Sequence, residues 1–113
     1  MTAPDMIVLD PNDNVATALR DLDGPAIVSI ANPDGSRFDL EITGPIKLGH
    51  KVAIVPIPVD SPAIKHGEPF GLATAPISPG AHAHVHNIIS LSRVGNEPRG
   101  TPRTYQSDFP AKT

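Results

Sequence analysis

The stretch Gly80-Ala81-His82-Ala83-His84-Val85-His86-Asn87 holds three of the chain's five histidines. Side chains alternate between the two faces of a strand, so an extended conformation would place His82, His84 and His86 on one face. Alternate residues of a strand lie roughly 6.6 Å apart, so two neighbouring imidazoles can converge on one ion, whereas three need a bend or a bulge. We therefore expect two of these histidines to act together with a ligand from elsewhere in the chain.

The histidine run allows more than one interpretation. Imidazole is the commonest protein ligand of transition metals, and its pKa near neutrality also lets it move protons. The same run could instead be a solvated strand face with stray metal affinity. The flanks favour a site: Ser78-Pro79-Gly80 is a turn signal before the run, and Ile88, Ile89 and Leu91 after it are apolar. These flanks predict that the run lies at the edge of a packed element.

Composition favours a small, mostly β domain. The 113 residues are typical of one domain, and 39% of them are hydrophobic. With three Phe, one Tyr and no Trp, the core must be aliphatic. Fourteen Pro and nine Gly argue against long helices and for short strands joined by turns.

The sequence also argues against several classes of function. The net charge is −3 without a basic patch, so we expect no nucleic-acid partner. No apolar run approaches the ~20 residues of a membrane span, and the first residues do not resemble a signal peptide. The absence of cysteine excludes disulfides and zinc–thiolate sites. We expect a cytoplasmic protein that does not bind membranes.

The order of apolar and turn residues predicts short strands and one helix. Val15, Ala18, Leu19 and Leu22 recur at helical spacing, which predicts a helix from Asn14 to Asp21. The predicted strands are Ile7–Leu9, Ala26–Ala31, Arg37–Ile42, Val52–Ile57 and Leu72–Ala75. We find no internal repeat.

His50 and Lys51 precede the predicted strand Val52–Ile57 directly, beside Gly49. A single histidine in this position is more often structural than catalytic, so composition alone leaves its role open.

Residues 93–113 differ in composition from the rest of the chain. They contain several prolines and charges but almost no apolar periodicity, so they cannot form a core of their own. One interpretation is a disordered tail. The other is an extended strap that docks on a partner or a second copy through Tyr105 and Phe109.

Several segments together resemble the altronate/galactarate dehydratase family, in the order found there. These segments are Asp13-Asn14-Val15, Gly49-His50-Lys51-Val52-Ala53, Lys65-His66-Gly67, Phe70-Gly71-Leu72-Ala73 and Gly80 to Asn87. They are similar to the family's small SAF-type domain, over roughly residues 6 to 92, and Gly80 to Asn87 is the most specific part. Members commonly have Tyr where this chain has His66, and Glu is frequent where it has Ala81. These departures bear on the substrate and not on the fold.

The resemblance implies a mostly β, SAF-type β-clip with one short helix over residues 6–92, followed by the extended tail 93–113. It implies the small subunit of a metal-dependent lyase that eliminates water from a sugar acid such as altronate or galactarate. Such a subunit would act with a large catalytic lyase subunit, would not be active alone, and is compatible with a higher oligomer. One alternative is the small subunit of sulfolactate sulfo-lyase, which eliminates sulfite. An alternative of another class is a non-catalytic assembly or ligand-binding module.

The resemblance also suggests roles for individual residues. We expect His84 and His86 to be catalytic and to bind a divalent metal, iron or manganese, together with the large subunit. We expect His82, Asn87, His50 and Lys51 to contact the hydroxy-acid substrate.

Overall fold

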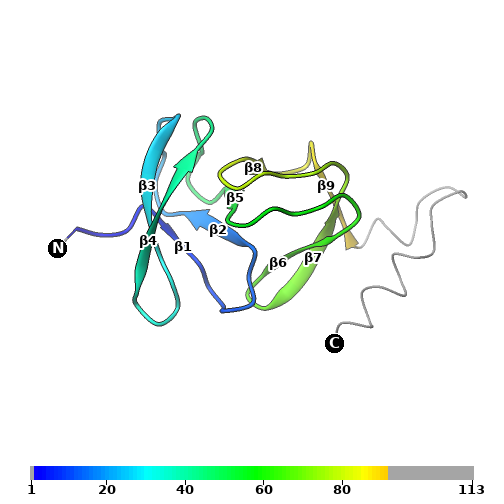
Figure 1. Cartoon of the computed structure of the whole chain (residues 1–113), viewed down its shortest axis with the longest axis horizontal. Helices are drawn as coiled ribbons and strands as arrows, with labels where there is room; N and C mark the ends of the chain where they lie inside the picture. The colour runs from blue at the N-terminus through cyan, green and yellow to red at the C-terminus, as the bar shows by residue number, and fades with distance from the viewer. Residues whose placement is uncertain (1, 92–113) are drawn as a thin grey trace, which may run out of the picture.

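The computed structural model describes residues 2–91, and every regular element in this range is a β-strand (Figure 1). The nine strands are β1 (Met6–Ile7), β2 (Val15–Ala18), β3 (Ala26–Ala31), β4 (Arg37–Ile42), β5 (Lys51–Ala53), β6 (Pro62–Lys65), β7 (Glu68–Ala73), β8 (His82–Ala83) and β9 (Ile88–Ser90). They form a six-stranded sheet in the order β4-β3-β1-β2-β5-β8 and a three-stranded sheet in the order β6-β7-β9. The expectation of a mostly β, clip-like fold of short, curled strands is confirmed. The predicted tail, residues 93–113, lies outside the described residues.

The hairpin of β3 and β4 forms where the sequence predicted it. Its two strands pair antiparallel from Ala26↔Ile42 to Ala31↔Arg37, and the intervening turn contains Gly35 at a φ of +91°. The polar side chains of β4 are exposed while the apolar ones are at least partly buried, as the alternating pattern indicated. The other predicted strands exist with shifted bounds: β1 starts earlier, β5 ends at Ala53, and β7 begins at Glu68.

The helix predicted from Asn14 to Asp21 is wrong, because this segment contains strand β2. It lies between two partners, pairing Met6↔Ala18 with β1 and Val15↔Ala53 with β5. A strand inside a sheet that is covered on both faces has apolar residues without strict alternation, and such a run can imitate helical spacing. Leu19, which the helical pattern would bury, is instead largely exposed beyond the strand's end.

The chain does contain a local repeat that the sequence analysis missed. In three places a strand is followed by a corner of the same kind. Each corner has a proline, then a buried isoleucine, and then, three positions after the isoleucine, a residue of positive φ. The three corners are Pro45-Ile46 with Gly49, Pro56-Ile57 with Asp60, and Pro76-Ile77 with Gly80. An isolated bridge joins Ile57 to Ile77, so the second and third corners pair with each other, and another joins Ile46 of the first corner to Leu22. This unit turns each strand back across the molecule.

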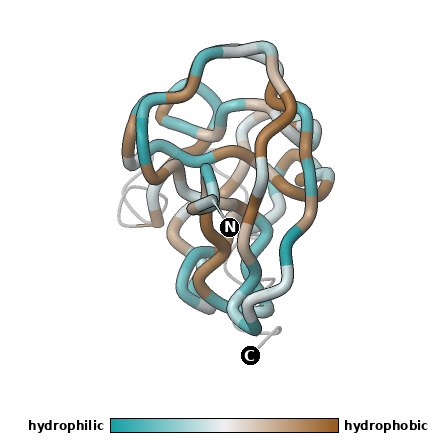
Figure 2. The backbone as a smooth tube through the Cα atoms, turned by 90° about the vertical axis from the view of Figure 1, so that its left-hand side faces the viewer, coloured by the Kyte–Doolittle hydropathy of each residue, from teal (hydrophilic) through white to brown (hydrophobic). Residues whose placement is uncertain are grey.

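The core is aliphatic, as composition predicted, and it falls into two clusters. One packs around Met6, Ile30 and Ile42, and the other around Val15, Ile57 and Ile77. Apolar and hydrophilic segments alternate along the backbone in Figure 2, as expected for short strands with one buried face. Within residues 2–91, no helix has the length and apolar character needed to cross a bilayer.

Two adjacent side chains hold the β6–β7 hairpin against the N-terminal segment. The carboxylate of Asp13, only 8% exposed, accepts backbone N–H groups from Leu9, Asp10, His66 and Gly67. The amide of Asn14 donates to the carbonyl of Pro62 and accepts the N–H of Ile64. These contacts fix the three-stranded sheet relative to β2.

Candidate functional site

His50 is positioned by the first of the three corners. Gly49 adopts a φ of +84°, and the N–H of His50 donates to the carbonyl of Lys47 at 2.9 Å to close the turn. The carbonyl of His50 in turn accepts the N–H of Ala18 at 2.8 Å, at the end of β2. His50 therefore sits on a tight turn anchored to a central strand, immediately before β5.

The third corner directly precedes β8, which lies at the edge of the six-stranded sheet. Gly80 has a φ of +87°, and a Cβ at this position would lie 2.0 Å from the backbone oxygen of Glu41. Beyond it, β8 pairs antiparallel with β5, with Lys51 opposite Ala83 and Val52 opposite His82. Continuing this register by one step brings His84 opposite His50. Strand pairing is thus what brings His50 to the histidine run.

The histidine run is not one extended strand, because β8 ends at Ala83, so the condition for a single face of His82, His84 and His86 is not met. The chain turns after Ala83: the N–H of Asn87 donates to the carbonyl of His84 at 3.0 Å. The side chain of Asn87 locks this turn, because its Oδ1 accepts the N–H of His84 and its Nδ2 donates to the carbonyl of His82, both at 2.9 Å. Asn87 acts here on the backbone of the two histidines it follows.

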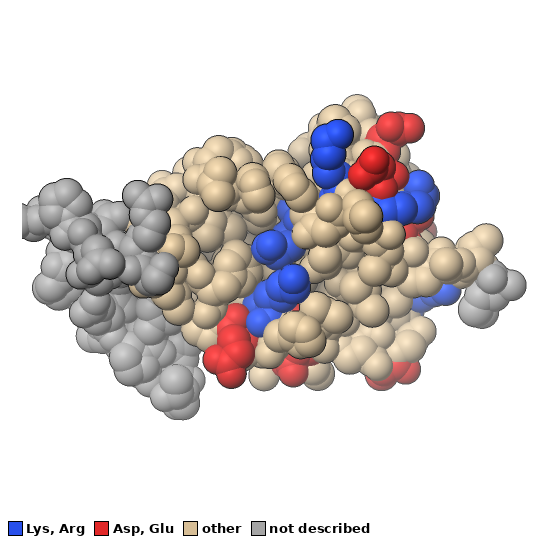
Figure 3. All heavy atoms as spheres, turned by 180° about the vertical axis from the view of Figure 1, so that it is seen from behind, with Lys and Arg blue, Asp and Glu red and all other residues tan. Residues whose placement is uncertain are grey.

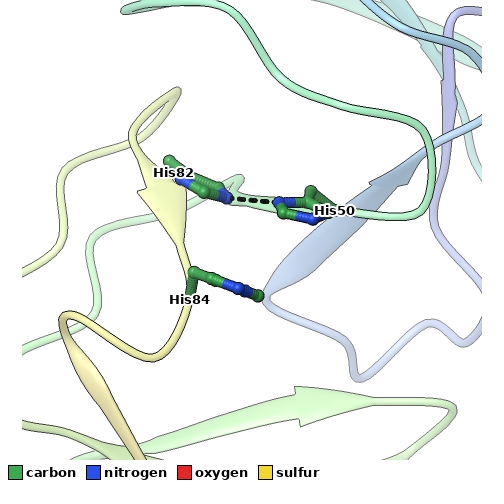
Figure 4. Close-up of side chains that lie close together, drawn as sticks. All are labelled: His50, His82 and His84. Carbon is green, nitrogen blue, oxygen red and sulfur yellow. Dashed lines mark hydrogen bonds between the residues drawn. The ribbon is translucent and has the colours of Figure 1, made fainter.

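Three imidazoles gather at this place, and they come from two segments of the chain (Figure 4). His50 Nδ1 and His82 Nε2 lie 2.9 Å apart in a hydrogen bond in which one ring is the donor and the other the acceptor. The ring centroids of His50 and His84 are 4.5 Å apart, and those of His82 and His84 are 5.1 Å apart, with nearly parallel planes. One nitrogen from each ring lies within 4.8 Å of the other two. This histidine cluster, His50, His82 and His84, is partly exposed.

His86 lies beside the cluster rather than in it. Its ring is tilted by 39° against that of His82, with the centroids 5.5 Å apart. The expectation that two histidines of the run meet a ligand from elsewhere corresponds to the observed grouping, with His82 and His84 from the run and His50 as the third. The specific pairing of His84 with His86 at a metal stays a prediction.

Burial and mutual repulsion act on the cluster together. The pKa of His82 is lowered, first by burial and then by His50, His84, His86 and Lys51 nearby. The pKa of His84 is lowered in the same way, again first by burial. Both rings are therefore favoured in the neutral form, which is the form that binds metals and accepts protons.

A hollow of about 330 Å³ opens next to the cluster. It is lined by Lys51, Phe70, Ala83, His84, Val85, Ile88, Ile89 and Ser90. The ammonium of Lys51 lies 5.2 Å from the centroid of the Phe70 ring, a cation–π distance. The pKa of Lys51 is lowered by burial and then by the charge of Lys65. Figure 3 shows Lys or Arg side chains near the middle of one face of the molecule, with Asp or Glu side chains next to them.

The structure brings most of the expected site residues together. His50, His82 and His84 form the cluster, and Lys51 lines the hollow that His84 also lines. His86 is adjacent, and Asn87 forms the turn. His66 lies elsewhere, in the β6–β7 turn at a φ of +59°. The sequence analysis missed Phe70 as part of the site. The available signal was that Phe70, one of only three phenylalanines in the chain, stands directly before Gly71.

The curled two-sheet fold, with histidines grouped at a strand edge, defines a β-clip domain of the SAF type. The chain belongs to the altronate/galactarate dehydratase SAF domain family, whose sequence profile matches residues 4–91.

The chain is similar to two altronate dehydratases and to one subunit of another lyase. It is 36% identical over 86 residues to altronate dehydratase of Bacillus subtilis (strain 168), and 39% identical over 75 residues to that of Escherichia coli (strain K12). These matches cover 72% and 66% of this chain but only 15% and 14% of the two relatives. It is 31% identical over 61 residues to (2R)-sulfolactate sulfo-lyase subunit alpha of Paracoccus pantotrophus, covering 54% of this chain and 91% of that subunit.

Proposed function

We propose that this chain is the small SAF subunit of a lyase that eliminates water from a sugar acid such as altronate or galactarate. The observation that carries the proposal is the histidine cluster beside the Lys51 hollow, in a member of this family. Two relatives are named altronate dehydratase. The third is named as the alpha subunit of an enzyme, and the present chain spans nearly all of that subunit.

The residues suit the chemistry of elimination from a hydroxy acid. A proton leaves the carbon next to the carboxylate, and hydroxide leaves the following carbon. The substrate carboxylate needs a cation, which Lys51 supplies at the hollow. The departing hydroxide needs a proton donor, and imidazole is suited to this task near neutral pH. We assign this role to His84 and His86. Because its lowered pKa favours the neutral ring, His84 first takes up a proton and then donates it. His50, His82 and Asn87 hold the substrate end of the site.

The residues present also fit a divalent metal such as iron or manganese. Neutral imidazoles are good ligands for these ions, and three of them offer nitrogens close to one another. Such an ion would act as a Lewis acid on the substrate carboxylate as negative charge develops. The chain's own part is to hold the ring nitrogens in place through the Gly49 corner and the Asn87 turn.

A second, large subunit is needed to complete this site. The cluster is partly exposed, and two apolar side chains beside it face solvent: Leu48 is 61% and Val85 is 81% exposed. A large catalytic subunit that covers them would exclude water and supply the base that removes the α-proton. We place the complex in the cytoplasm and expect no activity from the small subunit alone.

A second candidate function rests on the sulfo-lyase relative. The same site could serve elimination of sulfite from sulfolactate, since this also begins with proton loss next to a carboxylate. The third candidate is a non-catalytic module. In such a module, the hydrogen bond between His50 and His82 would be a purely structural contact.

An assay of the two-subunit complex separates these candidates. The chain would be co-expressed with a candidate large lyase subunit and tested on altronate, galactarate and sulfolactate. We expect turnover of one substrate class, lowered ~100-fold or more by His84→Ala or His86→Ala, as for loss of a general acid. His66→Asn, which removes the remote histidine in its turn, is the matched control. Variants that assemble normally by gel filtration and turn over at the wild-type rate would establish the non-catalytic module.

A further inference from the structure

We propose that His50, His82 and His84 form a three-histidine centre that binds one divalent transition-metal ion within this chain alone, with His86 outside the ligand set. The role of the ion in catalysis rests on the proposed function. The site itself is argued from the geometry of the three rings.

The distance between two of the nitrogens already matches a metal site. Imidazole nitrogens bind such ions at about 2.0–2.1 Å, so two ligands at right angles around one ion are about 2.9 Å apart. His50 Nδ1 and His82 Nε2 are separated by 2.9 Å. Their hydrogen bond therefore holds the pair at ligand spacing. An ion would bind to one side of the line that joins the two nitrogens, and the shared hydrogen would move to the other nitrogen of its own ring.

The third ring is close enough to complete the set. A nitrogen of His84 lies within 4.8 Å of both other ligand atoms. His84 is partly exposed at the surface, so its side chain can rotate the remaining distance without disturbing the core. Its backbone cannot drift, because its N–H is bound to Asn87 Oδ1 and its carbonyl to Asn87 N.

The protein around the rings is built to hold them. His50 is fixed by the Gly49 corner, and His82 by its pairing with Val52 in β5. In contrast, the contact that joins His86 to the cluster is a tilted ring contact with His82. A ligand set of three neutral nitrogens leaves coordination positions open. With Lys51 nearby, these positions would favour an anionic ligand such as a carboxylate.

The test is metal binding by the full 113-residue chain, without the large subunit. Co²⁺ and Zn²⁺ would be titrated by calorimetry, with Co²⁺ also followed by its visible absorption. We expect one equivalent to bind. His50→Ala, His82→Ala and His84→Ala should each weaken binding roughly 100-fold or more, since loss of outer-shell partners alone typically costs 10–100-fold. His86→Ala and His66→Asn should leave the Kd within about threefold, far below the effect of losing even an outer-shell partner.

A second measurement uses the wild-type chain, so it does not depend on whether the variants fold. Zn²⁺ added to the ¹⁵N-labelled chain should shift the imidazole nitrogens of three histidines and spare His66 and His86. Binding that requires His86 but not His50 would overturn the assignment, as would the absence of saturable binding. An inactive two-subunit complex that still shows the three-histidine binding would refute the proposed function and leave this inference standing.

Discussion

The carboxylate of Asp13 accepts the N–H of Gly67 at 2.8 Å, across 54 positions of sequence, and holds three further N–H groups as well. Asp13→Asn would turn an amide NH₂ toward donors that need an acceptor. Hydrogen bonds to a charged partner are worth more than neutral ones, so we expect a loss of about 3 kcal/mol in the free energy of unfolding. Urea denaturation followed by circular dichroism measures it.

The matched control for this change is Asp39→Asn. Asp39 is exposed on β4, so its substitution should change stability by less than about 0.5 kcal/mol. Equal effects of the two substitutions would show that the Asp13 contacts do not hold the hairpin.

Gly49 and Gly80 offer a second test, because they have similar φ angles but different surroundings. A Cβ at Gly49 would meet nothing within 4 Å. Gly49→Ala should therefore lower the free energy of unfolding only by the cost of a left-handed backbone conformation, about 1–2 kcal/mol. At Gly80 a Cβ would lie 2.0 Å from the backbone oxygen of Glu41. Gly80→Ala should therefore lose a further 1–3 kcal/mol or so from overpacking, measured by urea denaturation. A loss no larger than that of Gly49→Ala would mean that this close approach does not constrain β8.

The third prediction concerns acid stability through Asp5. Its pKa is lowered chiefly by the hydrogen bond from the Ser29 N–H, with Arg20 adding to the effect. A carboxyl with a lowered pKa in the folded state stabilises that state above its unfolded pKa of 3.8, and this contribution disappears as pH falls through the folded value. Asp5→Asn should therefore be less stable than the wild type at pH 6, and the difference should shrink below pH 3.8. Urea midpoints across this pH range measure it; a difference that stays constant would refute the assignment.

The fold was predictable where its determinants are local. The β3–β4 hairpin follows from the alternation of Arg37–Ile42 and from the turn before it, so its bounds were predicted correctly. The helix prediction failed at Val15–Ala18 because a strand paired on both sides and buried on both faces has no period-two signature. The repeated proline–isoleucine corners were visible in the sequence, but only their shared backbone conformation shows that they are one unit.

The site was predictable in part for the same reason. The spacing of the run from His82 to His86 predicted that two of its histidines would meet a group from elsewhere in the chain, but that group could not be named. His50 reaches the run only through the pairing of β5 with β8, a non-local contact that spacing does not encode. The turn after Ala83 depends on the side chain of Asn87, which was expected from the sequence to contact the substrate. The roles of these residues in catalysis remain predictions.

Val85 provides the test of the partner surface. It is 81% exposed, lies between His84 and His86 and lines the hollow. If the large subunit covers the cluster, Val85→Asp places a charge in a buried apolar contact, and we expect the Kd of the two subunits to rise at least ~10-fold, the scale of a 1.4 kcal/mol loss. Ile27→Asp is the matched control, since Ile27 is 71% exposed but lies on β3, four positions from β8 in the sheet order. Calorimetry or surface plasmon resonance with the purified large subunit measures both. If Ile27→Asp weakens assembly while Val85→Asp does not, the partner covers the opposite end of the sheet, and the histidine cluster is then not part of a shared site.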